Sequence, residues 1–239
     1  MEILFISDIH GRFENIEQVF KQEKDFDLLV CNGDFIDMYA LPEGFSEIYI
    51  TDLVLQKLLV CHKPLLCIPG NHDIVESMEL FEEVGCNLHG KVKKIGSLSF
   101  IGYGGATTPF NTNFEPKEEE IKTCLDRLAS KAKGDLVLVT HMPPLNTAMD
   151  KIQDNKHVGS KTISDFILKN KPLLALSAHI HESVGVDRVG RTTLFYPGPL
   201  YEGKYGIIKI DGKTIKCETR KIKIETKQTS RGHADLPTT

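Results

Sequence analysis

Five short apolar stretches, each followed within two residues by Asp, Asn or His, constrain the fold of this chain more than any other feature. They have the length of strands and almost no polar residue inside them, which is typical of strands that helices cover on both faces. Their positions are 2–7, 26–31, 64–69, 135–140 and 172–177. The pattern predicts an α/β fold.

Helical spacing separates these stretches. Phe13, Ile16, Val19 and Phe20 recur every three or four residues and predict an amphipathic helix that ends near Glu23. Similar helical patterns lie at 53–59, 79–84, 117–132 and 163–167. We expect a loop at 38–50, a hairpin at 91–101 and an antiparallel meander over 184–219.

Polar side chains stand directly after each apolar stretch. Ligands of an open α/β sheet bind just beyond the carboxyl ends of its strands, so we expect these side chains to converge at one sheet edge. The groups are Asp8 and His10, Asp34, Asn71 and His72, His141, and His179 and His181. Polar residues directly after a buried strand, as at 70–73, are costly unless they face solvent or take part in chemistry.

The donor types at these positions predict a metal centre. A carboxylate and an imidazole two residues apart, such as Asp8 and His10, can bind one ion together. Even without His72, the seven remaining oxygen and nitrogen donors exceed the four of a structural zinc site, and no cysteine is among them. We therefore expect two divalent cations with a carboxylate such as Asp34 between them, an arrangement that suits displacement at phosphorus.

Length and composition indicate one globular domain over residues 1–239. Of the 239 residues, 41% are hydrophobic and 26% are charged, as in ordinary globular proteins. No apolar run reaches the roughly 18 residues of a membrane span, and the chain opens directly into a strand. We expect a cytoplasmic protein without a membrane partner, with a flexible tail at 228–239.

Cysteine usage and charge narrow the expected partners. The six cysteines form no Cys-x-x-Cys pair, and most lie in apolar stretches where a reduced thiol acts as a small core residue. A formal charge of −4 does not attract nucleic acid, so an anionic partner would need a local positive site. The edges of the hairpin and the meander could pair two copies into a homodimer.

Together, the polar blocks resemble the calcineurin-like metallophosphoesterase family. The blocks are Asp8-x-His10, Gly33-Asp34-x-x-Asp37, Gly70-Asn71-His72-Asp73, His141 and His179-x-His181, in the family's order and roughly its spacing. The resemblance implies an α/β fold, a four-layer α/β/β/α sandwich with two mixed β-sheets. It also implies hydrolysis of phosphomonoesters or phosphodiesters by a hydroxide bridging two divalent metals. The expected substrate is a small phosphoester, for which a nucleotide is one candidate.

The resemblance also implies a role for each matching residue. One metal would be held by Asp8, His10 and His181, the other by Asn71, His141 and His179, with Asp34 between them. The catalytic residues would be His72, which stabilises charge or protonates the leaving oxygen, and Asp37, which keeps His72 oriented and cationic. Asp73 is the alternative partner of His72. Mn²⁺ is the expected metal, while Fe, Zn, Co and Ni suit the same donors.

Some residues depart from the blocks or match none. Ala178 stands where the family has a glycine, and its methyl group requires a negative φ. Arg12 could contact a phosphate, although a solvated side chain is the plainer expectation. Four histidines match no block and are expected to lie outside the site: His62, His89, His157 and His233.

A non-catalytic, metal-binding interaction scaffold of the same fold is the alternative function. Loss of His72 or of a ligand would favour the scaffold, and the sequence retains all of them.

Overall fold

The computed structural model describes residues 1–223, and the first three strands of the chain lie in a five-stranded sheet. Its order is β11-β10-β1-β2-β3, with β1, β2 and β3 parallel and β10 antiparallel to β1. The strands are β1 (Glu2–Ile6), β2 (Leu28–Asn32), β3 (Leu65–Ile68), β10 (Lys204–Asp211) and β11 (Thr214–Lys221).

A second, six-stranded sheet has the order β4-β5-β6-β7-β9-β8. Its four central strands are parallel, and an antiparallel strand closes each edge. The strands are β4 (Val92–Ile95), β5 (Leu98–Tyr103), β6 (Asp135–Thr140), β7 (Leu174–Leu176), β8 (Gly185–Val189) and β9 (Thr192–Tyr196). Both sheets are therefore mixed.

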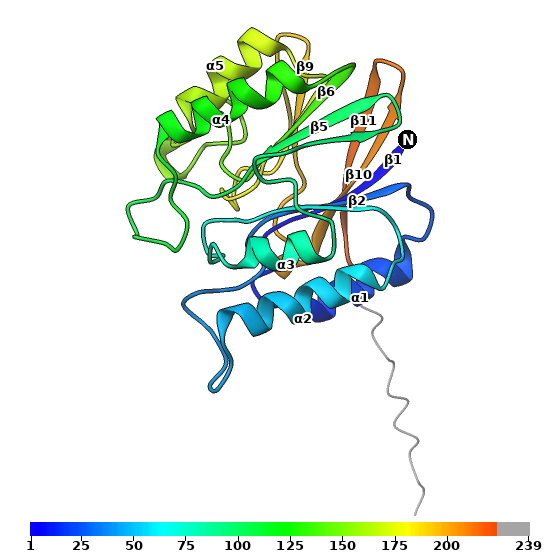
Figure 1. The fold of residues 1–239 in the computed structure, drawn as a ribbon, viewed down its shortest axis with the longest axis vertical. Coiled ribbons are helices and arrows are strands. Elements are labelled where there is room, and N and C mark those ends of the chain that lie inside the picture. Colours follow the sequence, from blue (N-terminus) through cyan, green and yellow to red (C-terminus); the bar gives the residue numbers. More distant parts are fainter. Residues whose placement is uncertain (224–239) are drawn as a thin grey trace, which may run out of the picture.

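Helices cover the outer face of each sheet, as Figure 1 shows, so the expected four-layer sandwich is confirmed. The five-stranded sheet carries α1 (Phe13–Gln22), α2 (Glu47–Leu59) and α3 (Ser77–Glu83), and the six-stranded sheet carries α4 (Glu118–Lys131) and α5 (Lys161–Asn170). Two short 3₁₀ helices, η1 (Gln153–Asn155) and η2 (Leu200–Glu202), lie in connections.

Strand β1 shows why the apolar stretches have no polar face. Leu4 and Ile6 pack against the helices of the first sheet, whereas Ile3 and Phe5 face the second sheet. Both faces are buried from Ile3 to Ile6, so these four positions are apolar. Polar residues therefore occur just after the parallel strands, where the chain leaves the core.

The predicted meander over 184–219 is wrong. Strands β8 and β9 form a hairpin in the six-stranded sheet, where β9 is parallel to β7, and β10 and β11 form a hairpin in the other sheet. Phe195 of β9 lies in the core between the sheets, and Gly206 of β10 leaves room for its ring. Residues between these hairpins cross from one sheet to the other, past the end of β1.

The predicted loop at 38–50 is wrong in its last four residues. Helix α2 begins at Glu47 because Ser46 caps it, with the Ser46 hydroxyl accepting a hydrogen bond from the N–H of Tyr49 at 3.3 Å. The remaining loop runs beside the carboxyl end of β2.

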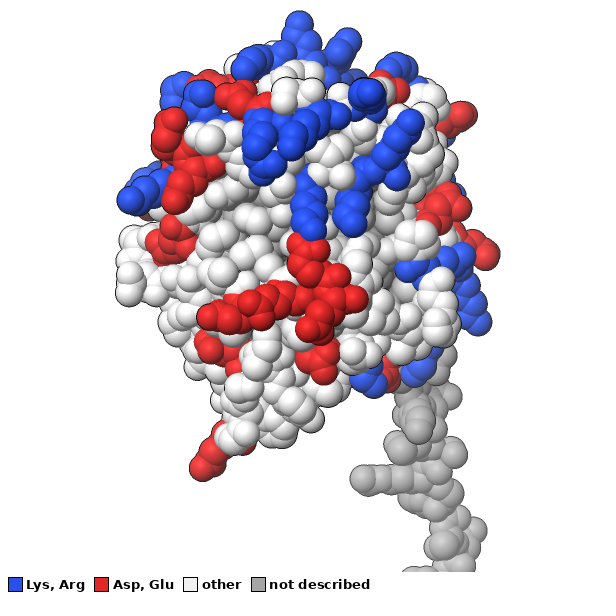
Figure 2. All heavy atoms as spheres, viewed as in Figure 1, with Lys and Arg blue, Asp and Glu red and all other residues white. Residues whose placement is uncertain are grey.

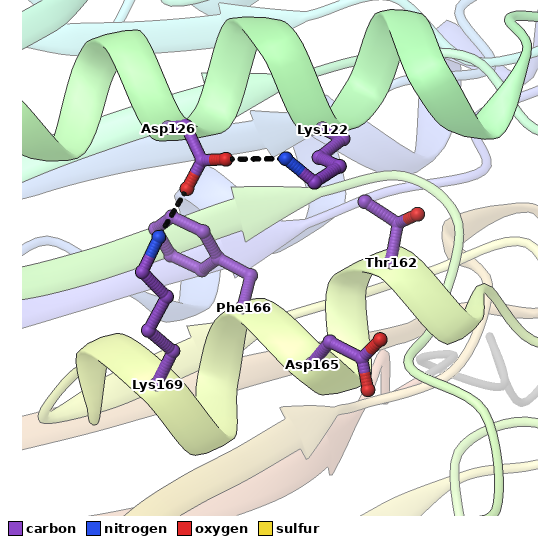
Figure 3. A pocket seen from close by; sticks show the side chains of 6 residues that line it. All are labelled: Lys122, Asp126, Thr162, Asp165, Phe166 and Lys169. Carbon is purple, nitrogen blue, oxygen red and sulfur yellow. Dashed lines mark hydrogen bonds and ion pairs between the residues drawn. The ribbon is translucent and has the colours of Figure 1, made fainter.

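The outer surface carries mixed charge. In Figure 2, Lys and Arg gather over the layer of α4 and α5, and Asp and Glu form a band near α3. Between α4 and α5, Asp126 pairs with Lys122 at 2.9 Å and with Lys169 at 2.8 Å (Figure 3). Exposed pairs of this kind contribute little to stability, and we interpret this face as solvated.

Two sequence expectations concern membranes and the end of the chain. Among residues 1–223, none of the helices has both the length and the apolar character needed to cross a bilayer. The predicted flexible tail at 228–239 lies outside the described residues.

Candidate metal centre

The predicted ligands meet where the strands of the two sheets end. Asp8 and His10 follow β1, Asp34 follows β2, and Asn71 follows β3, all in the five-stranded sheet. His141 follows β6, and His179 and His181 follow β7, in the other sheet. Our expectation of one sheet edge is therefore corrected, because the facing ends of two sheets supply the donors.

The first donor group contains Asp8, His10, Asp34 and His181, whose ligand atoms all lie within 4.8 Å of one another. Nε2 of His10 lies 3.6 Å from Oδ2 of Asp34, and Nε2 of His181 lies 3.3 Å from Oδ1 of Asp8. Asp8 and Asp34 are buried, so this negative charge requires cationic or hydrogen-bonding partners.

The second donor group contains Asp34, His141 and His179, also within 4.8 Å. Nε2 of His141 lies 3.3 Å from Oδ2 of Asp34 and 3.1 Å from Oδ1 of Asn71. Asp34 thus belongs to both groups, and Asn71 adjoins the second, as the family resemblance implies.

Backbone strain concentrates at these residues. Asp8, His10, Asp34 and His179 have φ between 47° and 74°, a region that costs non-glycine residues of order 1–3 kcal/mol each. Such strain persists only where the surrounding structure holds the residue, and it clusters at functional sites.

Two glycines allow the loops after β2 and β3 to approach. A Cβ on Gly70 would lie 2.0 Å from Oδ1 of Asp34, and a Cβ on Gly33, where φ is 87°, would lie 2.4 Å from the N atom of Gly70. Glycine is required at both positions. Their close packing sets the position of the Asp34 carboxylate.

Buried nitrogen atoms without partners show that the donors fit a metal. Three buried ring nitrogens have no hydrogen-bond partner within residues 1–223. They are Nδ1 and Nε2 of His10 and Nε2 of His181. An unsatisfied buried polar group costs about 1–3 kcal/mol. A divalent cation at the first donor group, which contains both histidines, would satisfy Nε2 of each.

Hydrogen bonds behind the ligands orient them. Nδ1 of His141 lies 2.7 Å from the carbonyl oxygen of Asn32, so it carries the proton and leaves Nε2 free for coordination. Tyr196 donates to Oδ2 of Asp8 at 2.9 Å, and the hydroxyl of Tyr201 lies 3.1 Å from Nδ1 of His181. The sequence analysis missed both tyrosines; the one available signal was a Gly-Pro turn between them, directly after an apolar stretch.

Burial and opposite charges shift the pKa values of the ligands in opposite directions. Burial alone would raise the pKa of Asp8, but the nearby His181 imidazole holds it at about 2. His141 is buried too, yet the Asp34 carboxylate raises its pKa to about 9. Burial and the nearby His141 charge lower the pKa of His179 to about 3. Without metal, the proton on His141 offsets part of the carboxylate charge.

His72 borders the cavity above the donor groups. The lining residues of this central cavity of about 400 Å³ are His10, Arg12, Asp37, Tyr39, His72, His181 and Tyr201. Nδ1 of His72 accepts a hydrogen bond from the N–H of Met38 at 3.3 Å, so the imidazole proton is on Nε2.

The carboxylates that we expected near His72 are placed differently. Oδ1 of Asp37 lies 3.8 Å from Nδ1 of His72, beyond hydrogen-bond distance. Asp73 accepts backbone N–H bonds from Phe35, Ile36 and Gly70 and is a structural residue. The expected cationic His72 is not favoured, because burial lowers the pKa of this imidazole.

The remaining predictions concern residues at the margin of the site. Ala178 is fully buried with a φ outside the positive region, so its methyl group does not displace His179. The Arg12 side chain is 66% exposed and lies 3.8 Å from Glu14, as expected of a solvated residue, although it borders the central cavity. His62, His89 and His157 belong to neither donor group, and His233 lies outside the described residues.

Comparison with known proteins agrees with this geometry. A sequence model described as calcineurin-like phosphoesterase matches residues 1–183. The uncharacterized protein MJ1162 of Methanocaldococcus jannaschii is 35% identical over 222 residues, which are 88% of this chain and 96% of that protein.

Two solved structures share the fold. TT1561 of Thermus thermophilus is 19% identical, with a TM-score of 0.72, and the match covers 93% of this chain and 99% of that one. A dimetal phosphatase from Danio rerio is 11% identical, with a TM-score of 0.63 and the same coverage of 93% and 99%.

Proposed function

Because the chain belongs to the calcineurin-like phosphoesterase family, we propose that it hydrolyses small phosphoesters with the help of two divalent cations. The observation that carries this proposal is the position of Asp34, whose carboxylate lies within 4.8 Å of the ligand atoms of both donor groups. A shared carboxylate suits two adjacent cations.

We propose a donor set for each cation. The first would be held by Asp8, His10, Asp34 and His181, and the second by Asp34, Asn71, His141 and His179. When bound, the cations would supply positive charge for the phosphoryl oxygens and a water acidic enough to attack near neutral pH. Carboxylate with imidazole favours Mn²⁺, Fe, Co²⁺, Ni²⁺ or Zn²⁺, and we propose Mn²⁺.

His72 would serve the leaving group. Its Nδ1 accepts the N–H of Met38, so Nε2–H is the group available to an ester oxygen in the central cavity. It can stabilise charge on that oxygen or give it a proton as the P–O bond breaks. We propose that Asp37 orients His72 through the Asp37–Met38 segment, because its carboxylate accepts the N–H of Tyr39 at 3.0 Å.

A cytoplasmic location completes the proposal. All six cysteines lie in the described part of the chain and are free thiols there, which suits a reducing compartment. The alternative of a non-catalytic scaffold gains no support from the site, since the seven ligands and His72 are present and assembled.

The test is hydrolysis of 4-nitrophenyl phosphate and of bis(4-nitrophenyl) phosphate by the Mn²⁺-loaded protein. His72→Ala should lower kcat by about 10²- to 10⁴-fold and leave the metal content unchanged. His62→Asn is the matched control, because it replaces an exposed histidine in a left-handed turn that asparagine accepts. Absence of turnover of both esters, or equal turnover by His72→Ala, would reject the proposal.

A further inference from the structure

A second cavity of about 300 Å³ opens beside the central one. We call it the side cavity, and its apolar wall is formed by Phe13, Ala40, Leu41, Pro42 and Ile50. His10, Arg12 and Asp37 border both cavities. The two cavities are therefore adjacent, and the candidate metal ligand His10 lines both of them.

Gly11 lines the side cavity next to His10 and leaves space in front of its apolar wall. It follows His10 with a φ of 71°, and a Cβ on it would lie 3.9 Å from Cγ2 of Ile50. A side chain at this position would project toward the apolar wall. The absence of one leaves room for a group that extends from the donor groups toward Ile50.

The apolar wall is held in place before any ligand arrives. Ile50 is 6% exposed and belongs to the core between the first sheet and its helices, and Phe13 and Leu41 are half-buried against the same core. A preformed apolar surface binds an apolar group without a further cost of ordering. Beside a centre built from carboxylates and imidazoles, such a wall is unsuited to a small polar alcohol.

We propose, on the basis of the proposed function, that the side cavity binds the apolar alcohol portion of the phosphoester. The phosphoryl group would lie in the central cavity, and an alkyl or aryl group on the ester oxygen would contact Phe13, Leu41 and Ile50. Hydrolysis breaks the P–O bond to this group, water adds a hydroxyl to phosphorus, and the second proton of water ends on the released alcohol. The enzyme therefore selects phosphoesters of apolar alcohols over those of small polar alcohols.

The hydrolytic test compares esters of primary alcohols with similar acidity, so that intrinsic reactivity does not decide the result. These are 3-phenylpropyl, ethyl and glycerol phosphates, each as the monoester and as its methyl diester. We expect kcat/KM for the 3-phenylpropyl ester to exceed that for the ethyl ester by at least about tenfold, since burial of several methylene groups and a ring contributes that much or more.

Three variants locate the preference. Leu41→Ser removes part of the wall, and Ala40→Trp fills the mouth from an exposed position that tolerates a large side chain. Both should reduce the ratio of the two kcat/KM values by about fivefold or more. Leu53→Ser is the matched control, because Leu53 is half-buried against the same core and does not line the side cavity.

Binding of uncleavable analogues separates this inference from the proposed function. By calorimetry, the Mn²⁺-loaded protein should bind 3-phenylpropylphosphonate more tightly than ethylphosphonate, and Leu41→Ser should lose the difference. Selective binding without hydrolysis of any ester would overturn the proposed function and leave the side cavity assigned. Hydrolysis with equal rates and equal binding would overturn the side cavity alone, and failure to bind either phosphonate would overturn it as well.

Discussion

The hydroxyl of Tyr196 donates a hydrogen bond of 2.9 Å to Oδ2 of Asp8, 188 residues earlier in the chain. Tyr196 ends β9 in the six-stranded sheet, and Asp8 follows β1 in the other. The family match covers residues 1–183, so Asp8 lies inside the matched region and Tyr196 lies beyond it. The last strands therefore help to shape the donor groups.

We predict that Tyr196→Phe lowers the affinity for Mn²⁺ by about 10- to 100-fold, the usual effect of removing a hydrogen-bond partner from a ligand. The carboxylate of Asp8 keeps its charge but loses a donor that sets its orientation. Calorimetric titration of metal-free protein with Mn²⁺ measures the change. Tyr103→Phe is the control, because Tyr103 lies in the same sheet with its side chain in the core beneath α4 and α5. Equal affinities of the two variants would contradict the prediction.

Asp34→Asn should reduce the number of bound cations from two to at most one. The variant loses a charged oxygen that lies near both donor groups, and each of them would then depend on its remaining ligands. Metal analysis after equilibration with Mn²⁺ gives the stoichiometry. Loss of a hydrogen-bond partner of a ligand can lower activity by about 100-fold. Loss of the ligand itself should lower activity by more than that.

Asp37→Asn makes the same chemical change at a neighbouring carboxylate outside the two proposed sets. It should retain both cations and lose activity only. A stoichiometry of two in Asp34→Asn, or a loss of one cation in Asp37→Asn, would show that the carboxylates have been assigned wrongly.

The sequence predicted the strands and the donor groups well because both depend on local pattern. A strand buried on two faces, such as β1, must be apolar throughout, and the polar residue after it marks its end. Local sequence does not show which of the two sheets a strand joins. Both the β8–β9 hairpin and the β10–β11 hairpin look like ordinary antiparallel pairs in the sequence. Long-range contacts, such as that of Phe195 with Gly206, decide that they join different sheets.

The residues that support the ligands were harder to predict for a related reason. A tyrosine that bonds a carboxylate 188 residues away leaves no spacing to recognise. The family resemblance implied Asp37 as the partner of His72, but the backbone N–H of Met38 holds the ring, and no side-chain pattern reveals that contact. The sequence therefore predicted that these donor side chains converge, but it did not indicate which residues support them.

Metal binding should release protons near neutral pH. The Asp34 carboxylate raises the pKa of buried His141 to about 9 in the absence of metal, and coordination requires the neutral imidazole. We expect release of at least about one proton per protein at pH 7, falling as the pH rises above about 9. Mn²⁺ titrations in two buffers of different ionisation enthalpy count the protons. Binding heats that are the same in both buffers at pH 7 would contradict this.

His89 should make the stability of the fold depend on pH. Its ring lies between Tyr103 and Phe114, and its Nδ1 accepts the N–H of Gly104 at 3.0 Å, which requires an unprotonated nitrogen. Burial lowers the pKa of His89 from 6.5 to about 4. Below pH 6.5 the unfolded chain therefore binds a proton that the folded protein does not, and stability falls as the pH drops toward 4.

The contribution lost over this window should be about 3 kcal/mol, since one pKa unit corresponds to about 1.4 kcal/mol. Carboxylates also titrate there, so the measurement is the difference in unfolding free energy between the natural protein and His89→Gln, both metal-free. Glutamine keeps an acceptor for Gly104 and does not titrate. The difference should be largest above about pH 7 and should shrink by about 2–3 kcal/mol by pH 4. Parallel stability curves for the two proteins would show that His89 is protonated equally in the folded and unfolded states.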